Sequence, residues 1–385
     1  MSASIDTVLR TAVSSGAVPN VVALAADRGG VIYEGAAGPR VAGQPEPVTA
    51  DTMFRVASMT KIITTTAALQ LVERGALDLA APVAAYLPEF ADIQVLEGFD
   101  GDTPRLRPPA SAATVHHLMT HTSGLGYWFW NADLANYEKV TGLPSLLTGR
   151  IAALSAPMVA DPGTRLEYGT NTDWLGRVVE AVSGESLDKY LDSHIFGPLG
   201  LGSATFLMSP EQRAASTPVH VPGPDGSWIP TEVDWSQDPE WWAGGHGLYV
   251  TPRDYLTVLR TLLGGGSLDG VRILDPATVA DAFRNQIGDL RWPEHVETGD
   301  PNAACSLTLG PGWTWGHGLL LNMADHPGRR RAYSGSWAGL INAFFWVDPT
   351  SGVTAAIFSQ FLPFVTPQML ATYDAFEEAV YASLT

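Results

Sequence analysis

Strand patterns lie at both ends of this chain and helical patterns fill its middle, and this distribution constrains the fold more than any other feature. The β-rich runs cover residues 21–26, 31–34, 247–251, 315–322, 343–347 and 353–358. From residue 77 to about 203 the pattern is mostly helical and interrupted by Pro and Gly. We therefore expect an α/β (α+β) fold, in which an antiparallel sheet flanked by helices carries an inserted all-helical domain.

This pattern also predicts domain boundaries. Residues 1–65 and 240–385 would build a discontinuous sheet domain, and residues 66–239 a mainly helical domain with lid loops. Residues 218–242 are rich in Pro, Gly and Trp, which is typical of a long functional loop. Helices are expected near 4–16, from Ser58 to about Gly75, and over 252–263 and 367–384.

Composition excludes several classes of partner. Of the 385 residues, 45% are hydrophobic and 16% are charged, which is typical of a globular protein with a substantial core. The formal net charge of −18 disfavours nucleic acid and anionic membranes as partners. The sequence has no 18-residue apolar run, no signal-peptide pattern and only one cysteine, Cys305. We therefore expect a cytoplasmic protein without a membrane span.

The chemistry-bearing motif with the clearest mechanism is Ser58-Met59-Thr60-Lys61, at the start of a predicted helix. Three residues make nearly one helical turn, so Ser58 and Lys61 would project from the same face. A lysine whose pKa is lowered by burial can accept the serine proton during attack on an acyl carbon. Taken alone, the motif also fits an N-cap serine beside a solvated lysine.

A second motif places Tyr168 just before a predicted helix, within Glu167-Tyr168-Gly169-Thr170-Asn171. Its phenol could relay a proton near Ser58 if a lysine ammonium stabilises the phenolate. A tyrosine that only packs against the helix start is the alternative.

The order of three motifs carries a family resemblance. Ser58-x-x-Lys61, then His117-Leu-Met-Thr-His121-Thr-Ser-Gly, then Tyr168 before a helix resemble the serine β-lactamase and penicillin-binding-protein-like superfamily. Within it, the chain is most similar to the family VIII carboxylesterases and class C β-lactamases. The resemblance covers nearly the whole chain. It implies a β-lactamase-like fold, Ser58 as nucleophile, and Lys61 and Tyr168 as general base and acid.

The same resemblance implies a third motif on a strand that borders the site. Trp337-Ala338-Gly339 matches the Trp-x-Gly of many family VIII esterases, and Tyr333-Ser334-Gly335 is the second possible alignment. The first alignment implies an oxyanion hole made by the backbone N–H groups of Ser58 and Leu340, which would stabilise charge that develops in the transition state.

Two departures from the class C pattern limit the analogy with β-lactamases. Thr170 stands where that pattern has an asparagine, with Asn171 one place later, and Trp337 stands where it has a lysine. β-Lactams are therefore expected to be poor substrates. Asp173 resembles the Tyr-x4-Asp arrangement of some family VIII esterases and is interpreted as a structural residue at the helix start.

Other catalytic classes fit the sequence less well. His116, His117 and His121 include an i, i+4 pair but no third zinc-ligand motif, so no metal is expected. The sequence has no Gly-x-Ser-x-Gly elbow, and Gly244-Gly245-His246-Gly247 lacks the strand-loop-helix context of a phosphate-binding loop. No cofactor is therefore predicted.

Aromatic residues concentrate in predicted loops, where they would form an apolar wall for an acyl or alcohol group. The predicted substrate-binding residues are Trp337, Gly339, Tyr127, Trp128, Trp242 and His246. For His246 a turn histidine is the alternative. The expected activity is hydrolysis of a small-molecule carboxylic ester. An acyltransferase, a D-amino-peptidase or amidase, a weak β-lactamase and a non-catalytic binding protein on the same fold remain alternatives.

Overall fold

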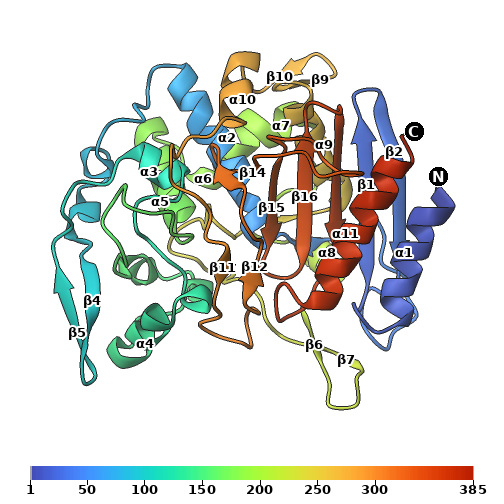
Figure 1. Cartoon of the computed structure of the whole chain (residues 1–385), viewed down its shortest axis with the longest axis horizontal. Coiled ribbons are helices and arrows are strands. Elements are labelled where there is room, and N and C mark those ends of the chain that lie inside the picture. The colour runs from blue at the N-terminus through green and yellow to red at the C-terminus, as the bar shows by residue number, and fades with distance from the viewer. Residues whose placement is uncertain (1, 385) are drawn as a thin grey trace.

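The computed structural model, which describes residues 2–384, is built around a seven-stranded antiparallel sheet in the order β13-β14-β15-β16-β17-β1-β2 (Figure 1). Its strands are β1 (Val21–Asp27), β2 (Gly30–Ala37), β13 (Trp313–Trp315), β14 (Leu320–Asn322), β15 (Gly335–Gly339), β16 (Ala343–Asp348) and β17 (Val353–Phe358). The amino-terminal hairpin joins the last strand, with Val22 opposite Phe358. The two ends of the chain therefore complete one sheet, which confirms the predicted fold class.

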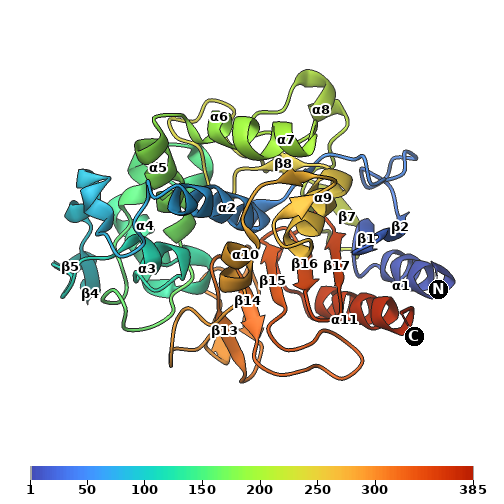
Figure 2. The same ribbon diagram turned by 90° about the horizontal axis from the view of Figure 1, so that it is seen from above.

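Helices cover both faces of this sheet. The terminal helices α1 (Ser2–Ser14) and α11 (Pro367–Ala382) lie on one face, and α9 (Pro252–Leu263) lies on the other (Figure 2). Every residue of β16 and β17 is buried. This explains why their sequences are nearly continuous apolar runs without the alternation of a half-exposed strand.

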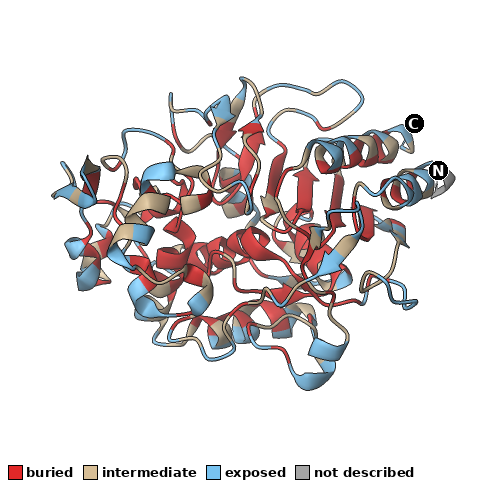
Figure 3. Ribbon diagram, turned by 90° about the horizontal axis from the view of Figure 1, so that it is seen from below, coloured by how far each residue is buried: buried red, intermediate tan, exposed pale blue. Residues whose placement is uncertain are grey.

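Helix α2 (Thr60–Glu73) crosses the middle of the molecule between the sheet and the helical part. It is buried from Thr60 to Leu71, which is the expected position for a helix that is apolar and small-residue-rich on all sides. Buried residues accordingly concentrate in the centre of the molecule as well as in the sheet (Figure 3). Lys61, which lies in this buried part of α2, is consequently held away from water.

The segment over 66–239 is mainly helical, with α3 (Val115–Met119) and α6 (Leu187–Leu191) packed on α5 (Asn171–Ser183). It also contains two hairpins that the sequence analysis missed. Their strands are β4 (Val95–Asp100), β5 (Thr103–Arg107), β6 (His220–Pro222) and β7 (Trp228–Pro230). A register shift at Leu96/Gly98 interrupts the alternation that would have revealed the first hairpin. The domain boundaries stay a prediction.

Two predicted strands differ in the structure. The run over 315–322 is not one strand, because a turn containing Gly316 and Gly318 divides it into β13 and β14. The tip of this turn approaches α2 so closely that a Cβ on Gly318 would lie 2.5 Å from Thr65 Oγ1. The run over 247–251 forms β8 (Tyr249–Val250), which pairs with β3 (Phe54–Arg55) outside the main sheet.

The remaining short elements connect these layers. They are α4 (Ala132–Thr141), α7 (Gly197–Leu199), α8 (Pro210–Ala214), α10 (Pro276–Ala282), β9 (Ser267–Leu268), β10 (Val271–Arg272), β11 (His295–Val296) and β12 (Leu307–Thr308). Among residues 2–384, none of the helices has both the length and the apolar character needed to cross a lipid bilayer.

Candidate active site

Ser58 lies in a strained turn between β3 and α2. The residue before it, Ala57, has a φ of +43°, a left-handed conformation that non-glycine residues rarely adopt. A single 3₁₀ turn, Ala57–Met59, then leads into α2. Only 7% of Ser58 is exposed, so its hydroxyl faces the interior between the sheet and the helical part.

Lys61 lies one turn further along, and its Nζ is 3.2 Å from Ser58 Oγ. The same Nζ donates to Tyr127 Oη at 3.0 Å and to the carbonyl oxygen of Gly245 at 2.8 Å. Burial lowers the pKa of Lys61 to about 7, although the Asp173 carboxylate acts in the opposite direction. A substantial fraction of neutral amine next to Ser58 is therefore present near neutral pH.

Tyr168 lies just before α5, with its hydroxyl turned towards Ser58 and Trp337. Its oxygen accepts a hydrogen bond from Trp337 Nε1 at 2.9 Å. Burial raises the pKa of Tyr168, while hydrogen bonds with Ser58 and Trp337 act to lower it. The phenol is therefore protonated at neutral pH and is held in place as a proton donor.

Four tryptophan rings enclose the Tyr168 ring. The ring centroids of Trp130, Trp292, Trp315 and Trp337 lie 5.9, 6.1, 6.3 and 4.7 Å from that of Tyr168. All four rings are tilted relative to the Tyr168 ring, and of the four only Trp337 donates a hydrogen bond to the phenol oxygen. Trp337, predicted to bind substrate, thus contacts the candidate acid directly.

Asp173 is a site residue that the sequence analysis assigned to a structural role. Its carboxylate is completely buried, accepts a hydrogen bond from Tyr127 Oη at 3.1 Å and lies 3.2 Å from His246 Nδ1. Burial acts to raise the pKa of Asp173, but His246, Lys61 and the Gly245 N–H together hold it below its usual value. The carboxylate is therefore an anion within two hydrogen bonds of Lys61.

Gly245 makes this arrangement possible. Its N–H donates to Asp173 Oδ1 at 2.8 Å while its carbonyl accepts from Lys61. A Cβ at this position would lie 2.5 Å from Asp173 Oδ2, so only glycine allows the backbone so close to the carboxylate. The backbone of Gly245 therefore bridges two buried charged groups, the Asp173 carboxylate and the Lys61 amine.

Gly339 ends β15 beside the Ser58 turn. A Cβ there would lie 2.4 Å from the carbonyl oxygen of Val56, so glycine is required for this close approach. Gly339 thus contributes to backbone packing, and the next residue, Leu340, lines the same hollow as Ser58. Tyr333 of the alternative third motif is 43% exposed and is not among the residues around this hollow.

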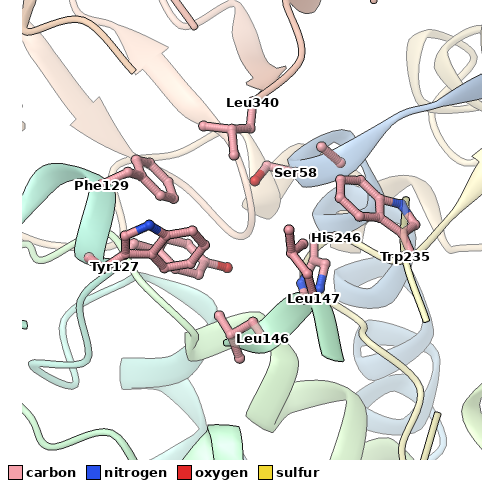
Figure 4. A pocket seen from close by; sticks show the side chains of 10 residues that line it. Ser58, Tyr127, Phe129, Leu146, Leu147, Trp235, His246 and Leu340 are labelled. Atoms are coloured by element: carbon pink, nitrogen blue, oxygen red, sulfur yellow. The ribbon is translucent and has the colours of Figure 1, made fainter. Parts of the chain in front are cut away.

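The hollow beside Ser58 is lined almost entirely by apolar groups (Figure 4). Its lining residues are Ala57, Ser58, Tyr127, Trp128, Phe129, Leu146, Leu147, Trp235, His246 and Leu340. Of the predicted substrate-binding residues, Tyr127, Trp128 and His246 lie in this wall, and Trp242 lines an adjoining hollow. Leu146 and Leu147 were not expected in this wall, because nothing in their local sequence pattern distinguishes them from ordinary core residues.

Other residues singled out from the sequence lie elsewhere. Asn171 hydrogen-bonds Ser123 and the carbonyl oxygens of Leu125 and Glu167, so it holds the loop ahead of Tyr127. His117 takes part in the N-terminal cap of α3, and His121 stacks against Tyr168. Within residues 2–384, His, Cys, Asp and Glu side chains form no group of three or more that could hold a metal ion.

Comparison with known proteins gives one family. The family model described as Beta-lactamase matches residues 5–379. The chain is 34% identical to a monacolin J acid methylbutanoyltransferase of Aspergillus terreus, covering 98% of this chain and 95% of the relative. It is 31% identical to a lovastatin esterase of Penicillium rubens, covering 89% of each.

Solved structures agree with these matches. The unliganded selenomethionyl simvastatin synthase from Aspergillus terreus superposes with a TM-score of 0.84 at 32% identity, covering 98% of this chain and 97% of the other. EstCE1, described as a hydrolase with promiscuous acyltransferase activity, superposes with a TM-score of 0.79 over 97% and 98% of the two chains. Its identity of 23% makes it evidence for the fold alone.

Proposed function

Since this chain belongs to the Beta-lactamase family, as its motifs indicated, we propose that it is a serine carboxylesterase acting through a covalent acyl-enzyme on Ser58. The single observation that carries the proposal is the contact between Lys61 Nζ and Ser58 Oγ, 3.2 Å apart in a setting that brings the pKa of Lys61 to about 7. A buried amine of this kind can accept a proton at neutral pH, as a solvated lysine cannot.

The proposed acylation step begins with attack of Ser58 Oγ on the ester carbonyl carbon. The serine proton passes to neutral Lys61, and the carbonyl oxygen becomes an oxyanion facing the N–H groups of Ser58 and Leu340. The bond to the alkoxy oxygen then breaks, and the Tyr168 phenol gives its proton to the departing alcohol. Lys61 returns a proton to Tyr168, which leaves a neutral acyl-enzyme and a neutral active site.

In the second half of the reaction, water attacks the acyl carbon and gives a proton to neutral Lys61. The bond between the acyl carbon and Ser58 Oγ then breaks, and Lys61 returns that proton to Ser58 Oγ, which releases the acid and restores the serine and the neutral amine. Lys61 is therefore the proposed base in both directions, because the phenol of Tyr168 is protonated at neutral pH.

The setting of Trp337 favours simple esters over β-lactams. Its indole N–H donates a hydrogen bond to the Tyr168 oxygen. An indole carries no positive charge, so position 337 offers no ion pair to the carboxylate of a β-lactam. The hollow beside Ser58 is apolar, which suits an uncharged acyl group. A small-molecule ester is thus the proposed substrate. A cytoplasmic location, supported by a single cysteine in the whole sequence, is part of the same proposal.

Acyl transfer to an alcohol is the second candidate. Tyr168 lines a hollow together with Trp130 and Trp292, whose rings offer an apolar surface to an acceptor alcohol next to the proposed acid. The relative from Aspergillus terreus is named for transfer of a methylbutanoyl group, and the one from Penicillium rubens for an esterase activity. A short branched acyl donor with a bulky alcohol is therefore a sensible first substrate pair.

Nitrophenyl esters of short acids, assayed with the wild type and with Ser58→Ala, test the proposal. We expect turnover by the wild type only, together with a fluorophosphonate adduct on Ser58 detected by intact mass. Turnover that survives in Ser58→Ala would remove Ser58 as the nucleophile. Adding an alcohol and analysing the products distinguishes the two candidates, since a transferase gives a new ester where an esterase gives the free acid.

A further inference from the structure

The hollow that contains Ser58 has a neighbour on the side away from the sheet. This second hollow lies between the 146–149 segment and the loop over 235–247. Leu146, Leu147, Trp235 and His246 line both hollows. We call the hollow at Ser58 the near lobe, the second one the far lobe, and these four shared residues the partition.

The position of Tyr168 decides which part of an ester would enter the near lobe. The leaving alcohol oxygen must lie next to the Tyr168 phenol, which protonates it. Ser58 and Leu340 line the near lobe, whereas Tyr168 is not among its lining residues. Tyr168 instead lines a separate hollow with Trp130 and Trp292. The acyl group is therefore the part of the substrate that faces the near lobe.

The partition is held in place by backbone contacts between two loops. Ser236 N donates to the carbonyl oxygen of Leu147 at 3.2 Å, and Glu240 N donates to that of Gly149 at 2.8 Å. A Cβ on Gly149 would lie 2.9 Å from Pro239 Cα, so these segments are in close contact. These contacts hold the backbones of the two segments that carry the partition in a fixed relative position.

The side chains of the partition differ in how firmly they are anchored. His246 is fixed by Asp173, 3.2 Å from its Nδ1. The indole N–H of Trp235 is buried and has no hydrogen-bond partner, and its ring packs edge-on against His246 with centroids 5.8 Å apart. Figure 4 shows Trp235 and Leu147 among the side chains that surround the hollow beside Ser58. Apolar packing is therefore what holds the side chains of Trp235 and Leu147 in the partition.

We propose that the two lobes form a two-compartment acyl pocket in which Trp235 and Leu147 set the upper limit of acyl chain length. This inference rests on the proposed acyl-enzyme chemistry at Ser58. The intact enzyme takes short, apolar acyl groups that fill the near lobe, and the far lobe receives a longer straight chain only when one of these side chains is shortened.

The test compares acyl chain-length profiles. Nitrophenyl acetate, butanoate, hexanoate, octanoate and decanoate are assayed with the wild type, Trp235→Ala and Leu147→Ala. Each methylene that gains burial adds about fourfold to kcat/KM. In both variants we therefore expect the octanoate-to-butanoate ratio of kcat/KM to rise by about 10- to 100-fold. The opposite change, Leu147→Phe, narrows the near lobe. It should lower the butanoate-to-acetate ratio of kcat/KM.

Trp228→Ala is the matched control. Trp228 packs on Phe361, with ring centroids 4.8 Å apart, and lines neither lobe, so its removal leaves a cavity without opening the partition. Its chain-length ratio should match that of the wild type. An unchanged ratio in folded Trp235→Ala and Leu147→Ala overturns the inference, and so does an equal rise in Trp228→Ala. Leu147 is only half-buried, so its substitution should disturb folding less. If Trp235→Ala does not fold, the chain-length ratios of Leu147→Ala and Leu147→Phe provide the test.

A second readout separates this inference from the proposed function. Nitrophenyl alkylphosphonates phosphonylate an active serine without turnover, and their alkyl group takes the place of the acyl chain. The rate of adduct formation on Ser58 is followed by intact mass for methyl, butyl and octyl reagents. If no ester is hydrolysed, esterase function fails. A rise in the octyl-to-butyl ratio in Leu147→Ala still supports the two lobes, and a flat ratio contradicts them.

Discussion

Replacing Trp337 by phenylalanine isolates one hydrogen bond in the proposed mechanism. The indole Nε1 of Trp337 donates to Tyr168 Oη at 2.9 Å, and the two rings are 4.7 Å apart. Phenylalanine keeps an aromatic ring on β15 but removes the donor. The Tyr168 oxygen then loses the group that stabilises it as its proton moves to the leaving alcohol.

The expected magnitude follows from the change in charge on Tyr168. A hydrogen bond to a group that becomes charged is worth about 1.5–3 kcal/mol, compared with about 1 kcal/mol for a neutral pair. The bond already exists before reaction, so only the increase of about 0.5–2 kcal/mol enters the barrier. At about 1.4 kcal/mol per tenfold in rate, Trp337→Phe should lower kcat/KM by about 2- to 30-fold for alkyl esters, whose leaving alkoxide needs a proton. The loss should appear mainly in kcat, because the bond strengthens as the transition state forms.

Trp315→Phe is the control for this experiment. Trp315 is fully buried and also packs against Tyr168, with centroids 6.3 Å apart, but its indole N–H has no hydrogen-bond partner. Both substitutions remove the same atoms from a buried site, but only Trp337→Phe also removes a hydrogen bond, so the two variants differ in that bond. We expect Trp315→Phe to keep kcat essentially at the wild-type value, and in any case to lose less than Trp337→Phe. Equal losses in both variants, or near-wild-type activity in Trp337→Phe, would refute this role of Trp337.

Three further outcomes are expected. Because the pKa of Lys61 is about 7 and only its neutral amine accepts a proton, kcat/KM should fall as pH drops below that value; a profile flat across neutrality would contradict Lys61 as base. In Gly339→Ala the new Cβ would meet a carbonyl oxygen at 2.4 Å and displace β15 from the nucleophile, so kcat should fall by about 100-fold or more, whereas Gly202→Ala, with nothing within 4 Å of its Cβ, should match the wild type. Arg330→Met would leave Glu377 buried without its guanidinium partner 2.7 Å away, and chemical denaturation should show a loss of about 3–5 kcal/mol. Burial acts to raise the pKa of Glu377 but Arg330 keeps it below its usual value, so the stability from this pair is present at neutral pH and should be lost as pH falls through the pKa of the folded state.

The sequence was sufficient for features that depend on local geometry. The three-residue spacing of Ser58 and Lys61 places them on one helical face whatever surrounds that helix, and the structure has their side chains 3.2 Å apart. The apolar runs of β16 and β17, and the hairpin of β1 and β2, follow from side-chain pattern and turn residues in the same way. Order along the chain then gave the family, which the family model confirms.

Local pattern failed where a distant segment decides the conformation. The run over 315–322 was expected to be one strand, yet the chain turns at Gly316 and Gly318, where the tip of the turn lies against Thr65 of α2. The β4 hairpin is interrupted by a register shift that is not visible in its side-chain alternation. The first difference involves packing against a helix more than 100 residues away in the sequence, and the second is a backbone irregularity. The strand propensity of single residues encodes neither.

The chemistry of the site depends on the same distinction. The sequence determined that Ser58 has a lysine one turn away. A solvated lysine at that spacing would be protonated at neutral pH and could not act as a base. Only the tertiary structure buries Lys61 on all sides and brings Tyr127, Asp173 and Gly245 from three other segments to it. The physical reason is that spacing is set by the covalent chain, whereas the desolvation that brings the Lys61 pKa to about 7 requires the whole fold to close around that side chain.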